Sequence, residues 1–249
     1  MKNKTDSLCV SPSWKVSPSV RVLTTTRVGG VSKAPFNSMN LGLHVGDEHA
    51  HVLENRRLLA SHFSLPSEPV WLNQTHSAKV LEVHEDSLAD NHVDGAFTRK
   101  KQLVLAVLTA DCLPVVISDV KGHQLAVVHA GWRGLAGGIV SEALSNFTQG
   151  TSLHAWLGPA IGPSKFEVGE DVRTAFIECS QANEEFFTAG NAPGEYWADL
   201  YALAAAELRS AGCTVTGGEY CTYTQKSLFH SHRRDGVASG RMVTLAWMS

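Results

Sequence analysis

Apolar runs and polar breaks alternate along the chain in a pattern that predicts both strands and helices. Short, continuous runs of aliphatic and β-branched residues are typical of strands that are covered on both faces. We predict strands at Val20–Thr26, Val70–Leu72, Lys79–Val83, Leu103–Thr109, Val115–Ser118, Gln124–His129, Leu153–Leu157 and Met242–Trp247.

Four segments predict helices between these strands. Asp47 is a suitable N-cap for a helix that ends near Phe63, before Pro66. The other three are predicted at Gly137–Phe147 after a glycine-rich turn, from Val168 or Gly169 to about Glu178, and at Ala198–Ser210. Alternating strands and helices indicate an α/β fold, a mixed sandwich. We expect one domain over residues 1–249, with the first ~20 residues irregular, because no linker or repeat divides the chain.

Composition narrows the class of protein. With 43% hydrophobic and 18% charged residues, the 249-residue chain is typical of a soluble globular protein. A net charge of -3 offers no basic footprint for nucleic acid or an anionic membrane. The apolar run at Leu103–Ala110 is far shorter than the roughly 20 residues of a membrane helix. Five cysteines without a CxxC pair, and an N-terminus without a signal-like apolar core, lead us to expect a cytoplasmic protein.

Three strand ends carry residues that bind metals. His76, Cys112 and His129 each follow an apolar strand and lie next to residues that turn the chain, so their side chains can converge at one sheet edge. Two imidazoles and a thiolate suit zinc, and three protein ligands leave one position open, as in catalytic sites. Their spacing matches no local metal motif, so a buried apolar cysteine and two histidines bonded to backbone explain the same residues.

Several longer stretches carry a family resemblance. The segments Thr109–Pro114, His129–Gly134 and Gly158–Pro163 resemble the signatures of the laccase-domain, polyphenol-oxidase-like or peptidoglycan-editing-factor proteins. Further matching stretches are Asn40–Asp47, Gln74–His76, Phe166–Gly169, Ser231–Gly236 and Gly240–Met242. The resemblance spans roughly residues 20 to 249, and several long motifs in one order are more specific than any single short pattern.

The resemblance implies a single-domain α/β sandwich with a zinc site at His76, Cys112 and His129. It also implies purine nucleoside phosphorolysis of adenosine, inosine or methylthioadenosine, with adenosine deamination as a second activity. The small-molecule partners are then a purine nucleoside and phosphate. An older copper-oxidase name attached to the family makes Cu²⁺ the alternative metal. The sequence gives no oligomeric state.

Phosphorolysis needs a group that holds phosphate, and arginine suits this because its guanidinium bonds two oxygens at once. Arg133 is the first candidate because it closely follows His129 in a glycine-rich turn, and Arg233, Arg234 and Arg241 are the others. A surface ion pair explains Arg133 equally well. Arg233 and Arg234 beside Asp235 also fit a solvated charged turn.

Two carboxylates and three polar residues complete the candidate site. Asp111 and Glu167 are candidate acid/base groups, although Asp111 also fits a residue that orients a ligand, and Glu167 the first turn of a helix. The zinc-deaminase signature H-x-E with P-C-x-x-C is absent. Asn40, His44 and Gln74 are candidate substrate-binding residues. A hydrogen-bonding network around Asp47 would explain the 40–47 segment without a substrate.

Three other functions use the same residues. A zinc or cysteine amidohydrolase that edits peptidoglycan precursors would use Cys112 as nucleophile and a histidine as base. A copper-dependent phenol oxidase would need more histidine pairs than the two at His49-x-His51 and His230-x-His232. A non-catalytic zinc or nucleotide-binding module would need a fourth protein ligand, such as His44 or Cys221.

Overall fold

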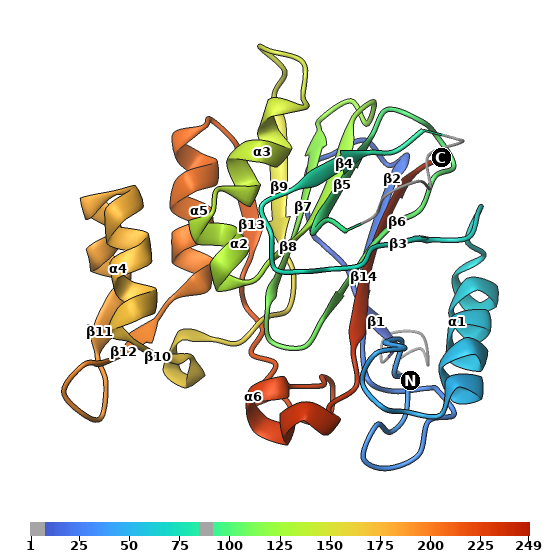
Figure 1. Cartoon of the computed structure of the whole chain (residues 1–249). Coiled ribbons are helices and arrows are strands. Elements are labelled where there is room, and N and C mark those ends of the chain that lie inside the picture. Colours follow the sequence, from blue (N-terminus) through green and yellow to red (C-terminus); the bar gives the residue numbers. More distant parts are fainter. Residues whose placement is uncertain (1–7, 85–91) are drawn as a thin grey trace.

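Two β-sheets lie face to face at the centre of the fold, and helices cover their outer faces (Figure 1). The computed structural model describes residues 8–84 and 92–249. Of the first ~20 residues, which were expected to be irregular, residues 1–7 lie outside the described part and Cys9–Val10 form a short strand. The α/β sandwich predicted from the sequence is confirmed. None of the described helices is long and apolar enough to span a membrane.

The first sheet has five strands in the order β1-β2-β14-β6-β3. Their bounds are Cys9–Val10 (β1), Val20–Thr25 (β2), Met242–Met248 (β14), Leu105–Thr109 (β6) and Val70–Trp71 (β3). β14 runs antiparallel between β2 and β6, whereas β3 is parallel to β6. The last strand of the chain therefore lies at the centre of this sheet.

The second sheet has six strands in the order β13-β9-β7-β8-β5-β4. Their bounds are Thr214–Gly217 (β13), Leu153–Leu157 (β9), Leu113–Asp119 (β7), Leu125–Ala130 (β8), Gly95–Thr98 (β5) and Val80–Glu82 (β4). A third, small sheet contains Glu167–Gly169 (β10), Phe187–Ala189 (β11) and Glu195–Ala198 (β12).

Buried apolar side chains form three layers of core. Between the two large sheets, residues such as Val107, Val127 and Trp156 pack together, which explains why these strands are hydrophobic on both faces. On the outer face of the five-stranded sheet, Leu59 of α1 (His49–Phe63) joins the core. The outer face of the six-stranded sheet is covered by α2 (Trp132–Ala136), α3 (Ile139–Ser145), α4 (Glu170–Cys179) and α5 (Leu200–Ser210).

The predicted strands and helices are present, with shifts at their ends and some additions. The glycine-rich turn expected before residue 137 contains α2, and Glu167–Gly169 is a strand rather than the start of α4. The sequence did not predict β1, β5, the small sheet, β13 or the short helices α6 (His232–Asp235), η2 (Pro163–Lys165), η3 (Gln181–Phe186) and η4 (Gly236–Ala238). These short segments lack the periodicity on which the prediction relied.

The predicted N-cap of the first helix is wrong. Glu48 occupies the N-cap position and makes no side-chain cap hydrogen bond. The Asp47 carboxylate instead accepts hydrogen bonds from Ser32 Oγ (2.6 Å), Asn40 Nδ2 (2.9 Å) and the backbone N–H of Glu48 (2.8 Å). Asp47 therefore ties two loop segments together in front of the helix, because a carboxylate can accept several donors at once.

Candidate active site

The strand register places Cys112, His129 and a buried aspartate at one end of the six-stranded sheet. β7 and β8 are antiparallel, with Leu113 opposite Ala130 and Pro114 opposite His129. Cys112, in the turn before β7, therefore lies beside Gly131, just after β8. β5 pairs with β8 so that Gly95 is opposite Val128, which puts Asp94 next to His129.

The five-stranded sheet contributes residues from two distant parts of the chain. Gln74, after β3, bonds the backbone of Leu108 with its side-chain amide, in the way that the backbone of a neighbouring strand does. Its Oε1 accepts the N–H of Leu108 (2.7 Å), and its Nε2 donates to the carbonyl of the same residue (2.8 Å). This pairing fixes the turn that carries His76. Since Met242 of β14 pairs with Thr109, Arg241 is brought beside the segment that leads to Cys112.

His76, Cys112 and His129 form the expected group. Their ligand atoms all lie within 4.8 Å of one another, and Cys112 Sγ is 4.0 Å from His76 Nε2. The two imidazole rings meet edge to face with centroids 4.9 Å apart. Gly131 forms the floor of the group, because a Cβ there would lie 3.1 Å from both Cys112 Sγ and His76 Cδ2.

Asp94 is a residue of the site that the sequence analysis did not identify. Its fully buried carboxylate accepts a hydrogen bond from His129 Nδ1 (2.8 Å) and three more from the backbone N–H groups of Thr75, His76 and Ser77 (3.0, 3.0 and 2.7 Å). Burial alone would raise the pKa of Asp94, but these hydrogen bonds lower it well below its usual range. The carboxylate is therefore ionised and the His129 Nδ1 carries a proton.

Charge in the group favours a thiolate. Burial acts to raise the pKa of Cys112, but the positive charge of His129 and hydrogen bonds from His129 and His76 outweigh it and lower the pKa to about 6. For His129, burial acts to lower the pKa, and the Cys112 thiolate and the Asp94 hydrogen bond raise it to about 9. The thiolate form is the one that binds metals and attacks electrophiles.

These residues fit a zinc ion. Ligand atoms around a tetrahedral zinc lie roughly 3.3–3.8 Å apart, so the observed separations need only a small contraction. His129 can offer Nε2 to an ion, because its Nδ1 is held by a carboxylate in the arrangement common for metal-binding histidines. In the described part of the chain no fourth His, Cys, Asp or Glu joins the group. A three-ligand set is typical of catalytic rather than structural zinc sites.

A cavity of about 590 Å³ opens onto this group. It lies within the size range of small-molecule sites. Its lining contains none of the chain's Trp, Tyr or Phe residues and, among the described residues, no carboxylate. The lining residues are His44, Leu72, Asn73, Gln74, Thr75, His76, His92, Leu108, Thr109, Ala110, Cys112, His129, His232 and Arg241.

The cavity thus contains some of the candidate site residues expected from the sequence. Besides the His-Cys-His group it contains His44, Gln74 and Arg241, and it adds His92 and His232, which sequence reasoning did not select as site residues. His232 is the first residue of α6 and begins a charged segment that is also typical of a surface turn. Its sequence therefore gave no separate signal for the cavity.

Asp111 lies behind the cavity. Its buried carboxylate accepts hydrogen bonds from Thr222 Oγ1 (2.6 Å), Ser231 Oγ (3.0 Å) and the backbone N–H of Arg233 (2.6 Å). These bonds fasten the start of α6, and with it His232, to the turn that carries Cys112. Of the two interpretations open from the sequence, this geometry favours orientation of the site.

Five other candidates do not line the cavity, and one of them, Arg234, pairs with Asp235 and donates to the carbonyl of Thr222 (2.8 Å). Arg133 is exposed and stacks on the ring of Trp132 at 4.2 Å. The Arg233 guanidinium donates to the carbonyl of Glu167 (2.8 Å), and the Glu167 carboxylate accepts from Asn191 Nδ2 (2.9 Å). Asn40 is fully buried and accepts the backbone N–H of Arg241 (2.9 Å), so it supports the cavity wall from behind.

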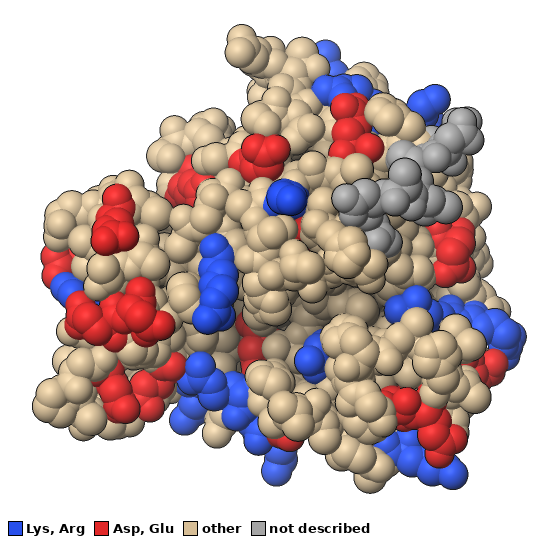
Figure 2. Space-filling model, in the orientation of Figure 1, with Lys and Arg blue, Asp and Glu red and all other residues tan. Residues whose placement is uncertain are grey.

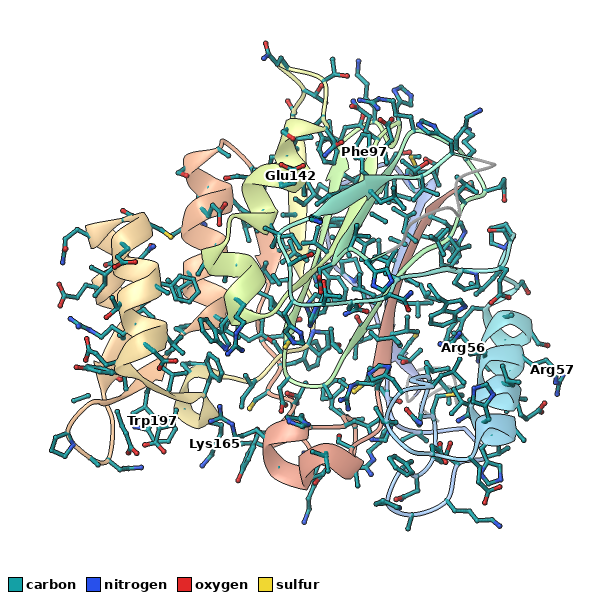
Figure 3. All side chains as sticks on the ribbon, viewed as in Figure 1. Arg56, Arg57, Phe97, Glu142, Lys165 and Trp197 are labelled. Carbon is teal, nitrogen blue, oxygen red and sulfur yellow. The ribbon has the colours of Figure 1, made fainter. Side chains whose placement is uncertain are left out.

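Positive charge gathers at one side of the cavity. Burial lowers the pKa of His44, and Arg241 and Arg56 lower it further, so the imidazole is neutral at neutral pH. Figure 3 shows Arg56 on the side of α1 that faces the sheet, whereas Arg57 points away from it. Elsewhere on the face shown in Figure 2, acidic side chains gather over the part of the molecule that contains α4 and the small sheet. The side of the cavity near Arg241 is therefore suited to an anion.

The two histidine pairs that resemble copper ligands do not form one site. His49 and His51 lie on α1. His230 is fully buried, with neither ring nitrogen hydrogen-bonded, and its partner His232 lines the cavity. Among residues 8–84 and 92–249, the His-Cys-His group is the one set of three metal-binding side chains.

Comparison with known proteins finds relatives that match nearly the whole chain. A protein of Shigella flexneri named purine nucleoside phosphorylase YfiH is 42% identical over 97% of this chain and 99% of its own length. One from Xylella fastidiosa (strain 9a5c), also named purine nucleoside phosphorylase, is 44% identical over 94% of this chain and 95% of its own. The crystal structure of Neisseria meningitidis protein NMB0706 superposes with a TM-score of 0.90 at 39% identity, covering 97% of this chain and 99% of that one.

The family model that matches the chain is described as multi-copper polyphenol oxidoreductase laccase and covers residues 21–249. The matched range leaves out β1 and the first residue of β2 but includes every other strand of the two central sheets. It also includes all the residues that line the cavity. The chain therefore belongs to the multi-copper polyphenol oxidoreductase laccase family.

Proposed function

We propose that the chain is a zinc-dependent purine nucleoside phosphorylase that converts adenosine, inosine or methylthioadenosine, with phosphate, to the free base and ribose 1-phosphate. The observation that carries this proposal is the shared cavity, in which the His-Cys-His group and Arg241 face the same space. The name of the Shigella flexneri relative supports the same reaction. Five cysteines without a disulfide support a reducing, cytoplasmic location.

Arg241 is the proposed phosphate-binding residue. Its guanidinium is largely buried and held through Nη1 by the carbonyls of Ser239 (2.6 Å) and Gly240 (3.2 Å), which leaves other N–H groups for an anion. It lies close enough to Cys112 and Asp111 for their charges to act on its pKa, which burial nevertheless lowers. We infer that phosphate binds between Arg241 and His44, in place of the Arg133 site expected from the sequence.

Bond breaking requires the purine to leave with the electron pair of its bond to ribose and to take up a proton, while a phosphate oxygen bonds the anomeric carbon. No described carboxylate lines the cavity, so we assign the proton donor to an imidazole, His92 or His232. Zinc bound by His76, Cys112 and His129 would supply a Lewis acid at this wall. We propose adenosine deamination as a second activity of the same cavity, with an imidazole again moving the proton.

The proposal is tested by chromatography of the products from adenosine with and without phosphate, using the wild-type chain and Cys112→Ala. We expect adenine and ribose 1-phosphate only with phosphate and only from the wild type. Inosine that forms without phosphate would identify deamination. Adenosine that remains unchanged under all conditions would refute the nucleoside assignment.

A paired substitution tests the phosphate site. Arg241→Ala should raise the KM for phosphate roughly 10- to 150-fold, because hydrogen bonds to a charged group contribute about 1.5–3 kcal/mol. Arg57→Ala is the matched control, since Arg57 is exposed and bonds Glu54 on the outside of α1. An unchanged KM in Arg241→Ala would place phosphate elsewhere.

A second function is favoured by one feature of the site. Cys112, His129 and Asp94 form a nucleophile, base and orienting carboxylate of the kind found in cysteine hydrolases. Such a group would suit an amidohydrolase acting on peptidoglycan precursors. Stoichiometric zinc in the purified, active chain would count against attack by Cys112, because a metal-bound thiolate is a poorer nucleophile.

A further inference from the structure

Asp94 connects two of the three candidate ligands, although they come from different segments of the chain. His76 lies in the turn after β3, and His129 lies on β8. The Asp94 carboxylate, at the start of β5, is fully buried and contacts both segments. It is therefore placed to set the position of one ligand relative to the other.

The contact to His129 sets the orientation of its ring. Asp94 Oδ1 lies 2.8 Å from His129 Nδ1, and both side chains are buried. An ionised carboxylate can accept hydrogen bonds but cannot donate them, so Asp94 holds a proton on Nδ1. This leaves Nε2, on the side of Cys112 and His76, as the nitrogen that can give up its proton and bind a metal. Without the carboxylate, nothing in this contact would select that tautomer.

The contacts to the other segment hold His76 in an uncommon backbone conformation. His76 has φ 60°, in the left-handed region that non-glycine residues rarely occupy. Three consecutive N–H groups, from Thr75 to Ser77, point at the Asp94 carboxylate, and the Ser77 hydroxyl adds a bond of 2.9 Å. Such a concave run of N–H groups binds an anion, and here the anion is a side chain of the same chain.

We propose that Asp94 is a positioning residue that orients both His76 and His129 and thereby sets the affinity of the site for a metal ion. The proposal rests on the metal-binding part of the proposed function and is independent of the nucleoside reaction. Asp94 itself does not touch the ion. A residue that orients ligands in this way typically changes metal affinity by 10- to 100-fold when it is replaced.

The test is a pair of substitutions in the full chain. Asp94→Asn keeps the size of the side chain but replaces an acceptor oxygen with an NH₂ group and removes the charge. Asp119→Asn is the matched control, because Asp119 is also buried and accepts backbone N–H bonds from His123 (2.6 Å) and Gln124 (2.7 Å) at the far end of β7. Zinc affinity is measured without substrate by competition with a chromophoric chelator.

We expect Asp94→Asn to bind zinc 10- to 100-fold more weakly than the wild type, with Asp119→Asn unchanged. The cobalt-substituted protein gives a second readout, since its thiolate-to-cobalt and ligand-field bands report the ligand geometry. These bands should shift in Asp94→Asn and remain in place in Asp119→Asn. A purely structural role would change the melting temperature of both variants and leave the bands in place.

Two results would overturn the proposal. One is a folded Asp94→Asn variant with wild-type zinc affinity and an unchanged cobalt spectrum. If that variant does not fold, Asp94→Glu decides, because its longer side chain keeps the charge but cannot keep the bonds to His129 and to the N–H groups of Thr75 to Ser77 at their present positions; a folded Asp94→Glu variant with wild-type zinc affinity and an unchanged cobalt spectrum overturns the role of Asp94. A wild-type chain that binds neither ion would instead overturn the metal part of the proposed function.

Discussion

Gly131 provides a test of the metal site that needs no change to any ligand. Its backbone, with φ -61° and ψ 158°, is open to any residue, so Gly131→Ala introduces no backbone strain. The added Cβ would lie 3.1 Å from Cys112 Sγ and from His76 Cδ2. Because non-bonded carbon contacts are normally about 3.5–4.0 Å, both ligands must retreat by roughly half an ångström.

The size of the effect follows from the tolerance of metal coordination. Bond lengths in a zinc site vary by about 0.2 Å, so ligands displaced by half an ångström must be pushed back against the new methyl group. Overpacking of this kind costs about 1–3 kcal/mol, which corresponds to a loss of affinity of roughly 5- to 150-fold. The metal-free chain can relax by moving Cys112. The free energy of unfolding of the metal-free protein should therefore fall by less than the free energy of zinc binding.

Chelator competition and thermal unfolding of the metal-free protein check both parts of this prediction. Gly137→Ala is the matched control at the other end of α2, where φ is -76° and the nearest atom to a new Cβ is the Arg133 carbonyl at 3.0 Å. Gly131→Ala should lose zinc affinity and Gly137→Ala should not. Wild-type zinc affinity in Gly131→Ala would show that the ion does not bind above this glycine.

Two further predictions use pH. In chelator-treated protein, the rate at which iodoacetamide modifies Cys112 should rise with a midpoint near pH 6, because His129 stabilises the thiolate, and zinc should suppress the reaction; a midpoint near the ordinary value of about 8.5 would contradict the ion pair. Burial raises the pKa of Glu207, although hydrogen bonds from Ser141 oppose it, so the folded state disfavours the charge. The contribution of Glu207 to wild-type stability should therefore fall as pH rises from below its unfolded pKa of about 4.3 through the raised folded value. The free energy of unfolding of Glu207→Gln, relative to the wild type, should therefore increase between pH 4.5 and 7.5. The variant should be at least as stable as the wild type at pH 7.5, because its amide carries no charge and the Ser141 N–H and hydroxyl both donate to Oε1, which glutamine retains. Urea unfolding at pH 4.5 and 7.5 measures this, and a loss of more than about 2 kcal/mol at pH 7.5 would contradict it.

The strands that build the site could be predicted because they are buried on both faces. Leu105–Thr109 and Leu125–Ala130 are short, nearly continuous apolar runs, which are typical of strands covered on both faces. The strands of the small sheet could not be predicted. Glu195–Ala198, for example, is only partly buried and follows no periodic pattern.

The residues around the metal group show where sequence reasoning ends. Closeness to His129 in the chain makes Arg133 the first phosphate candidate from the sequence. In the structure, Arg133 lies on α2, where its guanidinium stacks on the ring of Trp132 and is exposed to solvent. Arg241 is far from both ligands in sequence and reaches the cavity only because β14 pairs with β6. Asp94 has no motif around it, and its importance depends on burial and on six hydrogen-bond donors that the sequence cannot place.

Backbone strain links these residues into one arrangement. Four non-glycine residues in the described part of the chain have a positive φ. Two of them are His76, a member of the His-Cys-His group, and Asp111, the neighbour of Cys112. Such a conformation costs about 1–3 kcal/mol at each residue, and it persists only where other interactions hold it. Asp94 holds the first through the N–H groups around His76, and Asp111 holds its own turn through Thr222, Ser231 and Arg233. Because these bonds offset strain at the site and do not contribute to the core between the sheets, replacing either carboxylate should disturb the metal group before it disturbs the fold.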